Sequence, residues 1–164
     1  MRNTIFYFTN PPLHPIIVFK AYNRIEMEVI SDMEKVVMDA ANNLIRPLSG
    51  FEQAKLVELS EGHSIISIEI SETALNSLGN VHGGFLYTLS DISAGIISVS
   101  HRLVSVTLNG SMNYIKGLSS GTLFFEANTL HKGRTTIVAD VKVTDQNQTL
   151  VATGTFTMYV LKTF

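Results

Sequence analysis

The stretch from Asn76 to Asp91 combines polar side chains with a pair of adjacent glycines. Gly83 and Gly84 open a predicted helix, where backbone N–H groups lack an intrahelical partner and the positive end of the helix dipole favours negative charge. Because glycine leaves these N–H groups uncovered, they can receive the oxyanion that develops when a carbonyl is attacked. Close packing of the helix on a sheet explains the two glycines equally well.

Asp91 lies eight residues after Gly83, within the same predicted helix and among apolar or small residues. An unpaired carboxylate is costly in such surroundings, so its presence needs a reason. Two reasons remain open: a carboxylate held by partners for the sake of the structure, or a catalytic carboxylate. The sequence favours the second.

Other chemistries have weaker support. Gly117-Leu-Ser119-Ser-Gly121 fits a G-x-S-x-G nucleophile elbow, but an elbow needs a following helix, and a strand is predicted after it. No dinucleotide or triphosphate loop is present, and the chain has no cysteine. The histidines lack metal-ligand spacing; they stand at positions 14, 63, 82, 101 and 131. We therefore expect neither a metal nor a cofactor.

The elements that must position these residues follow from the apolar periodicity. A short amphipathic helix over 27–45 and two short strands, 55–59 and 65–70, precede a helix over 82–100 that is apolar nearly all round. Four long strands follow, at 104–115, 122–130, 135–144 and 150–161. Consecutive strands joined by short turns pair antiparallel, which predicts an α+β fold in which an antiparallel sheet covers a buried helix.

Length and composition limit the remaining possibilities. The 164 residues suit one domain over 27–164, after an N-terminal extension over 1–26 that we expect to be poorly ordered; a targeting signal there is a minor alternative. Only 16% of residues are charged, against roughly 25% in average proteins, which suggests burial in an oligomer. A net charge of -2 and the absence of a long apolar run argue against nucleic-acid and membrane partners, and we expect a cytoplasmic protein.

The central segment resembles the hotdog-fold acyl-CoA thioesterases of the phenylacetic-acid-degradation type. The resemblance covers roughly residues 48–161, and its main motif is formed by Asn76, Gly79, His82, Gly83, Gly84, Leu89 and Asp91. Three further matches support it: Asn113-Tyr114-Ile115, Lys132-Gly133-Arg134 and Leu150-Val151-Ala152.

This resemblance implies a sheet wrapped around a long central helix and hydrolysis of a small acyl-CoA thioester to a free acid and CoA. Asp91 would be the general base or nucleophile, the Gly83 N–H would bind the thioester carbonyl, and Asn76 would polarise or orient it. Thr107 would help to place the attacking water. The substrate would also meet His82 and Gly84, where His82 mainly steadies the loop, and its phosphates would meet Lys132, Gly133 and Arg134.

The chain departs from the family pattern in two loops. It has Lys116-Gly117-Leu118 where a proline is common, and Gln146-Asn147-Gln148 where a glycine is usual, which puts the details of CoA contact in doubt. Alternatives to the thioesterase are a hotdog module that binds acyl-CoA as a sensor or regulator, and a hotdog dehydratase. The acyl group is not determined by the sequence.

The expected assembly is a homodimer or a dimer of dimers. Gly83 and Asp91 would lie about 12 Å apart along one helix, too far for one thioester carbon to touch both. We therefore expect each active site to combine Gly83 of one subunit with Asp91 of another.

Overall fold

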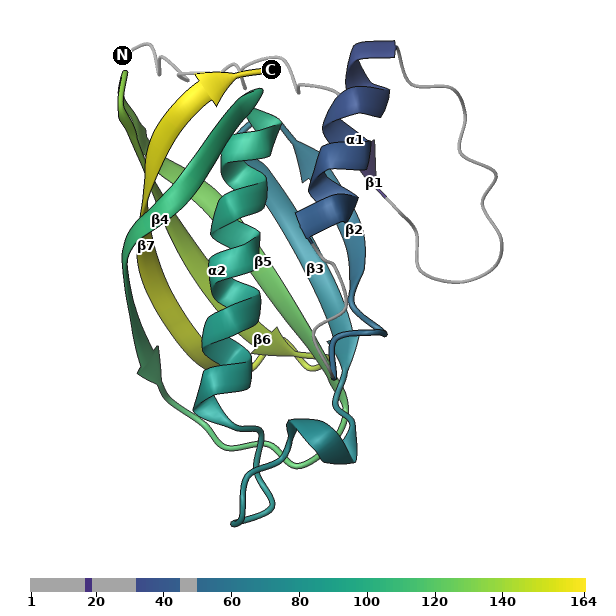
Figure 1. Cartoon of the computed structure of the whole chain (residues 1–164). Helices are drawn as coiled ribbons and strands as arrows, with labels where there is room; N and C mark the ends of the chain where they lie inside the picture. The colour runs from purple at the N-terminus through teal and green to yellow at the C-terminus, as the bar shows by residue number, and fades with distance from the viewer. Residues whose placement is uncertain (1–16, 19–31, 45–49) are drawn as a thin grey trace, which may run out of the picture.

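The computed structural model describes residues 17–18, 32–44 and 50–164, in which two helices cover one face of an antiparallel sheet (Figure 1). The strands are β1 (Ile17–Val18), β2 (Lys55–Ser60), β3 (His63–Glu69), β4 (Leu103–Tyr114), β5 (Thr122–Lys132), β6 (Thr136–Asp145) and β7 (Leu150–Thr163). The helices are α1 (Asp32–Leu44), a 3-10 turn η1 (Glu72–Ala74) and α2 (Gly83–Ser100). The strand order is β1-β2-β3-β5-β6-β7-β4. The predicted α+β architecture is confirmed.

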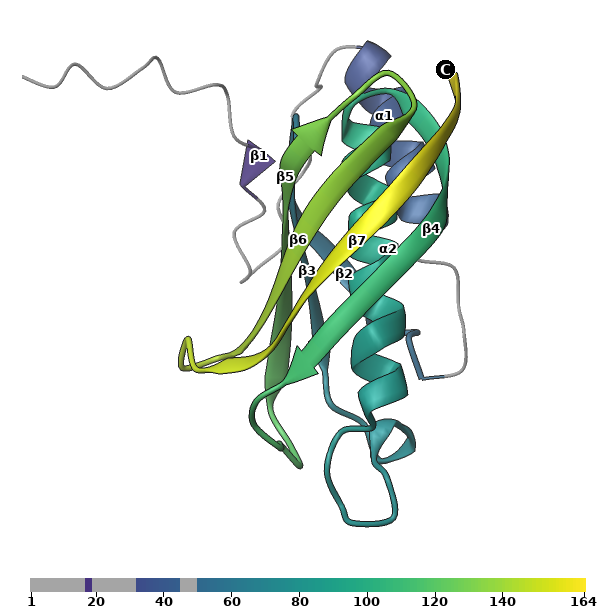
Figure 2. The same ribbon diagram turned by 90° about the vertical axis from the view of Figure 1, so that its left-hand side faces the viewer.

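Alternation along the long strands produces the core. In β6, Ile137, Ala139, Val141 and Val143 are fully buried, whereas the residues between them are partly or fully exposed. Because successive side chains of a strand point to opposite faces, this alternation gives the sheet one apolar face. The curved sheet turns this face toward α2, as the side view in Figure 2 shows.

α2 is the central helix that the sequence predicts. Leu89, Ile96 and Ile97 are fully buried, and so are Ser90 and Ser93, which agrees with a helix that is covered on most sides. Its length of 18 residues spans about 27 Å. None of the helices in the described part of the chain is long and apolar enough to span a membrane.

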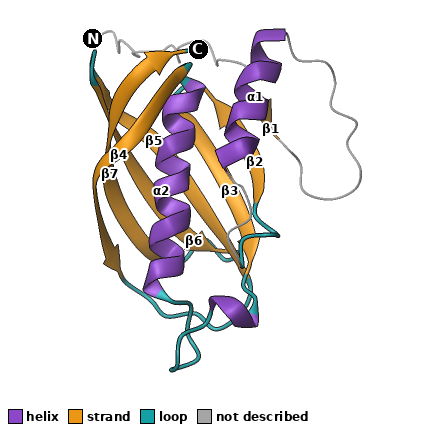
Figure 3. Ribbon diagram, in the orientation of Figure 1, coloured by secondary structure: helices purple, strands orange, loops and turns teal. Residues whose placement is uncertain are grey.

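α1 lies beside α2 on the same face of the sheet (Figure 3). It buries Ala41, a position of the predicted apolar stripe, and also Met38, which was not predicted to belong to it. The helix was predicted over 27–45, and residues 27–31 and 45 lie outside the described residues.

The two edges of the sheet differ. β1 pairs with β2 through Ile17 opposite Leu59 and Val18 opposite Glu58. These two residues belong to the predicted extension over 1–26, whose remainder lies outside the described residues. The other edge is β4, which has 12 residues, none of them charged, and which exposes Val106 and Leu108.

Candidate active site

The loop before α2 is built around the side chain of Asn76. Its Oδ1 accepts hydrogen bonds from the N–H of Leu78 at 2.9 Å and of Asn80 at 3.2 Å, while its own N–H donates to the Asn80 carbonyl at 2.7 Å. Gly79 takes a positive φ of 75°, which glycine adopts without strain. Asn76 therefore shapes the loop, and only its Nδ2 donors remain for a substrate.

His82 is the N-cap of α2. Its Nδ1 accepts a hydrogen bond from the Gly84 N–H at 2.9 Å, and its N–H donates to the Ala74 carbonyl at 2.8 Å. The Gly84 N–H is therefore occupied. No hydrogen bond from the Gly83 N–H is found within the described part of the chain, so this group is the available donor at the helix start.

Asp91 is hydrogen-bonded to Thr107; these are two of the predicted site residues that the structure brings together. The Thr107 hydroxyl donates to Asp91 Oδ1 at 2.7 Å, from β4 to α2. The expectation that Asp91 is enclosed by apolar residues is wrong for the single chain, because the side chain is partly exposed. The physical reason is that it faces β4, the open edge of the sheet, rather than the centre of the core.

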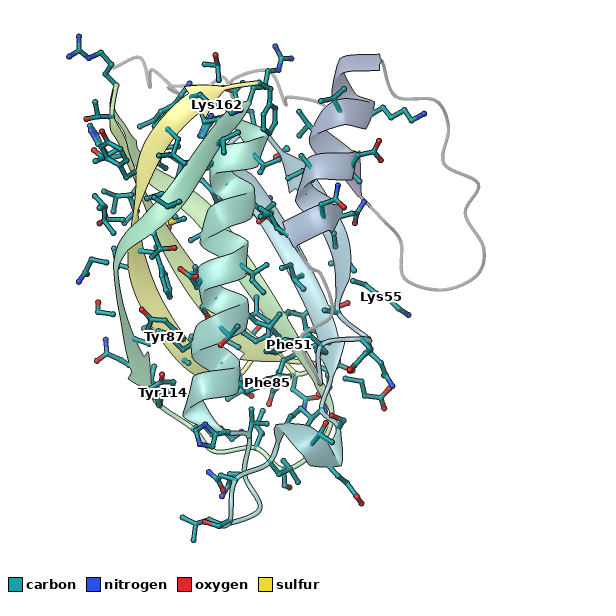
Figure 4. All side chains as sticks on the ribbon, in the orientation of Figure 1. Phe51, Lys55, Phe85, Tyr87, Tyr114 and Lys162 are labelled. Atoms are coloured by element: carbon teal, nitrogen blue, oxygen red, sulfur yellow. The ribbon has the colours of Figure 1, made fainter. Side chains whose placement is uncertain are left out.

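Gly83, Tyr87 and Asp91 form a row on α2, each one helical turn of four residues from the next. Each contacts the antiparallel strand β4. Gly83 lies under the ring of Tyr114, the Tyr87 hydroxyl donates to the Gly110 carbonyl at 3.3 Å, and Asp91 accepts from Thr107. Figure 4 shows Tyr87 and Tyr114 on the β4 side of α2.

Tyr87 stands midway between the two candidate catalytic residues in the sequence of α2, and its side chain contacts the sheet. A Cβ at Gly110 would lie only 2.5 Å from the Tyr87 hydroxyl, and the Tyr87 ring meets Phe156 edge-on at 5.4 Å between centroids. Gly83 and Asp91 of one chain are separated by eight residues, about 12 Å along the helix axis. The sequence analysis missed Tyr87, although its spacing of four from Gly83 and from Asp91 could have identified it.

Lys132, Gly133 and Arg134 lie away from these residues. They belong to the hairpin between β5 and β6. Lys132 lies near His101, and after burial its positive charge is a further cause that lowers the pKa of His101. His101 is the C-cap of α2, so this hairpin is at the opposite end of the helix from Gly83. Within one chain, the predicted phosphate-binding residues are thus separated from the carbonyl-binding loop.

The two loops that depart from the family pattern contact each other. Lys116 Nζ lies 3.8 Å from Asp145 Oδ2, just before Gln146. Asp145 Oδ1 accepts from the N–H groups of Asn147 and Thr149, each at 2.8 Å. The hydrogen bond from Thr149 is the main cause that lowers the pKa of Asp145 from its ordinary value. The departures therefore form one polar contact outside the Gly83 to Asp91 row.

The described residues around Ser119 and the acidic and histidine side chains lack the arrangement of a nucleophile elbow or a metal site. Ser119 lies in the loop between β4 and β5, and strand β5 follows it, so the helix that a nucleophile elbow requires is missing there. Across the described segments, no group of three or more histidine, aspartate or glutamate side chains is arranged to hold a metal ion.

Comparison with known proteins gives the family. Residues 78–152 match the model of the thioesterase superfamily. A hypothetical thioesterase protein from Streptococcus pneumoniae, solved with coenzyme A, is 35% identical with a TM-score of 0.71; the match covers 77% of this chain and 98% of that one. The chain belongs to the thioesterase superfamily. It therefore has the predicted hotdog fold.

Two other similar proteins extend the comparison. A Streptococcus mutans protein bound to acetyl CoA is 39% identical, with a TM-score of 0.67 and coverage of 72% of this chain and 96% of that one. The acyl-coenzyme A thioesterase PaaI of Escherichia coli is 26% identical over 98 residues, which are 59% of this chain and 70% of that protein. The chain thus belongs to the hotdog thioesterase family and is similar to its PaaI type.

Variants of the Streptococcus pneumoniae protein have also been solved. In one an aspartate and in the other a threonine is replaced by alanine, and the two positions are sixteen apart.

Proposed function

We propose that the protein is an acyl-CoA thioesterase that hydrolyses a small acyl-CoA to the free acid and CoA. The observation that carries the proposal is the row on α2. At one end is the Gly83 N–H, for which no partner is found among the described residues, and at the other is the Asp91–Thr107 pair. The relatives that were solved with coenzyme A and acetyl CoA support this substrate class. Asp91 and Thr107 are sixteen residues apart, the same residue types and spacing as the two positions replaced in the Streptococcus pneumoniae variants.

The proposed reaction uses few groups. Asp91 takes a proton from a water molecule that Thr107 helps to orient, and the resulting hydroxide attacks the thioester carbon. The electron pair of the C=O bond moves to oxygen, where the Gly83 N–H and the dipole of α2 stabilise it. The intermediate then expels the CoA thiolate, which recovers the proton from Asp91. Asp91 acting as nucleophile is the alternative form of the same step.

We further propose that a second copy of the chain completes the site at the β4 edge. A long edge strand with unpaired N–H and C=O groups is a template for pairing with another chain, and native proteins usually protect such an edge with charges. β4 has no charged residue and exposes Val106 and Leu108 by 48% and 59%. Association at this edge also fits the low overall share of charged residues.

The positions along α2 and β4 agree with such a pair. The two-fold axis that exchanges Gly83 with Asp91 passes near Tyr87, which is midway between them. Tyr87 bonds to Gly110, and Gly110 lies near the middle of β4, where a two-fold axis of an antiparallel β4 pair must also pass. One axis can therefore relate both elements, and each Gly83 then faces the Asp91 of the other copy.

The same symmetry offers a role for the distant hairpin. An antiparallel arrangement of two α2 helices brings the C-terminal end of one toward the N-terminal end of the other. Lys132 and Arg134, which are both exposed, would then lie on the side of the other copy's Gly83 and could meet CoA phosphates there.

A panel of acyl-CoAs tests the function. Short-chain, medium-chain and aromatic thioesters are incubated with the protein, and free CoA is measured with a thiol reagent. We expect release well above background from at least one thioester, and loss of that release in Asp91→Asn, which excludes a contaminating hydrolase. No release from any thioester, together with binding detected by calorimetry, would instead support the sensor or regulator.

A further inference from the structure

We propose that the ring of Tyr114 is the wall of the acyl-binding space beside Gly83 and determines which acyl groups fit. The inference rests on the proposed thioesterase function and adds a specificity-determining residue to it. It is carried by three observations: the contact between Tyr114 and Gly83, the exposure of the ring, and the contrast with Tyr87.

The contact is close and involves the tip of the ring. A Cβ placed at Gly83 would lie 3.3 Å from Cζ of Tyr114 and 3.4 Å and 3.6 Å from the two Cε atoms. These are the atoms nearest the hydroxyl, so the outer end of the ring covers the α-carbon of Gly83. A side chain at position 83 would require this ring to shift by a few tenths of an ångström.

The ring is also open to solvent. Tyr114 is the last residue of β4, and 53% of it is exposed in the single chain. An aromatic ring is a large apolar surface, and covering it with an apolar group is favourable. A thioester whose carbonyl oxygen meets the Gly83 N–H would bring its acyl group to this surface.

The two tyrosines at the contact between α2 and β4, Tyr87 and Tyr114, differ in how they are bound. The Tyr87 hydroxyl donates to Gly110 and its ring packs on Phe156, so Tyr87 is a fixed part of the structure. No hydrogen bond of the Tyr114 hydroxyl is found among the described residues. Because the approach to Gly83 is made by ring atoms, we assign the role of Tyr114 to its ring.

The experiment compares Tyr114→Ala and Tyr114→Phe with a matched control, Tyr159→Ala. Tyr159 is 43% exposed and lies on β7 between the buried Met158 and the partly buried Val160, which both pack on the core, so it points to the opposite side of the sheet. Melting temperatures first establish that all three variants fold. The acyl-CoA panel is then measured for kcat and KM.

We expect Tyr114→Ala to raise KM about tenfold for the acyl groups that the wild type prefers and to improve the relative use of bulkier ones, with a smaller change in kcat; changes of this size are typical when a pocket wall is altered. Tyr114→Phe should keep the wild-type ranking because it keeps the ring. Tyr159→Ala should be indistinguishable from the wild type.

Two results would overturn the inference: an unchanged ranking in Tyr114→Ala, or a Tyr114→Phe variant as impaired as Tyr114→Ala, which would assign the role to the hydroxyl. A second measurement separates this inference from the proposed function. Dissociation constants of the same acyl-CoAs are measured by calorimetry with Asp91→Asn alone and combined with Tyr114→Ala. If the wild type hydrolyses nothing, the thioesterase proposal fails, and the ranking of these constants still decides the role of Tyr114.

Discussion

The two ends of α2 both have a histidine as the capping residue, and the two histidines are used differently. At the N-terminal end, His82 binds the Gly84 N–H and leaves the Gly83 N–H without a hydrogen bond among the described residues. His82 is itself exposed. The N-terminal turn is therefore held by a capping bond and is still accessible at the Gly83 N–H, which suits a position where a substrate oxygen binds.

At the C-terminal end, His101 is enclosed. Its Nδ1 lies 3.2 Å from Glu61 Oε1 and its Nε2 lies 2.9 Å from the Thr129 hydroxyl, and only 8% of its side chain is exposed. The neighbouring Ser100 hydroxyl accepts from the Gly62 N–H at 2.9 Å. Every polar group of the imidazole has a partner, so this end joins α2 to the β2–β3 turn and to β5.

The two ends of α2 thus serve different properties of the protein, stability and catalysis. Pairing of buried polar groups stabilises a structure, whereas catalysis requires donors that are held in position and left free. In α2 these requirements are met at opposite ends. Changes near Asp91 and Gly83 should therefore affect turnover, and changes near His101 should affect stability.

The largest effect is expected from Asp91→Asn, which keeps the shape and removes the base. The kcat should fall by about two orders of magnitude or more, the size typical of losing a general base, while the melting temperature changes little. Asp140→Asn, on the outer face of β6, is the matched control and should keep full activity. Near-normal turnover in folded Asp91→Asn would return this carboxylate to a structural role.

The second prediction concerns whether the Gly83 loop and Asp91 of one active site come from the same chain or from two chains. Asp91→Asn and Asn76→Ala chains, each inactive alone, are mixed in equal amounts and allowed to exchange. A mixed dimer has one intact site and one doubly defective site, so about a quarter of wild-type activity should return. If mass spectrometry confirms exchange and activity stays at the level of the parents, each site lies within one chain.

The third prediction concerns the C-terminal end of α2, at His101. His101→Ala removes the partner of both Glu61 and Thr129 and should lower the free energy of unfolding by about 2 kcal/mol, the range for a partly buried polar group that loses its partner. Urea denaturation measures this change. The kcat should stay near the wild-type value, and a loss of activity in proportion to that of Asp91→Asn would contradict the division between the two ends.

The fourth prediction is a pH dependence from the same residue. Burial is the main cause that lowers the pKa of His101 below its ordinary value of 6.5, against an opposing hydrogen bond with Glu61. Between the lowered pKa and 6.5 the unfolded chain binds this proton and the folded chain does not, so stability contributed by His101 is present above 6.5 and is lost as the pH falls through this window. Urea unfolding at several pH values should show this slope in the wild type and a smaller one in His101→Ala. Equal slopes would show that other groups cause the dependence.

The smallest effect is expected from deleting residues 1–25. Among the described residues this removes only β1, a two-residue strand at the β2 edge, so the free energy of unfolding should change by no more than about 0.5 kcal/mol and kcat should not change. A large fall in melting temperature would mean that the deleted segment stabilises the core.

The parts of the fold that depend on local pattern could be predicted from the sequence. The alternation of β6 and the apolar residues of α2 gave both elements within a few residues, because each pattern repeats over many positions. β3 begins at His63, two residues before the predicted start, because Gly62 makes a tight turn with a φ of 78°.

Contacts between elements that are distant in the sequence could not be predicted in the same way. Asp91 was predicted from its place in an apolar helix and Thr107 from the family resemblance alone. Their direct hydrogen bond depends on the register between α2 and β4, which no local pattern encodes. The cover of Tyr114 over Gly83 was missed for the same reason. The short strand β1 has too few residues for any periodicity.

The unequal edges of the sheet have a consequence for how many copies can join. If one edge of the sheet paired with the opposite edge of the next copy, every added chain would leave an unpaired edge for another chain. The assembly would then grow into a fibre. Here β1 lies along part of β2, and β4 is the long uncovered edge of the described sheet. When β4 of one copy meets β4 of another, no second β4 remains, so growth by strand addition stops at a closed pair.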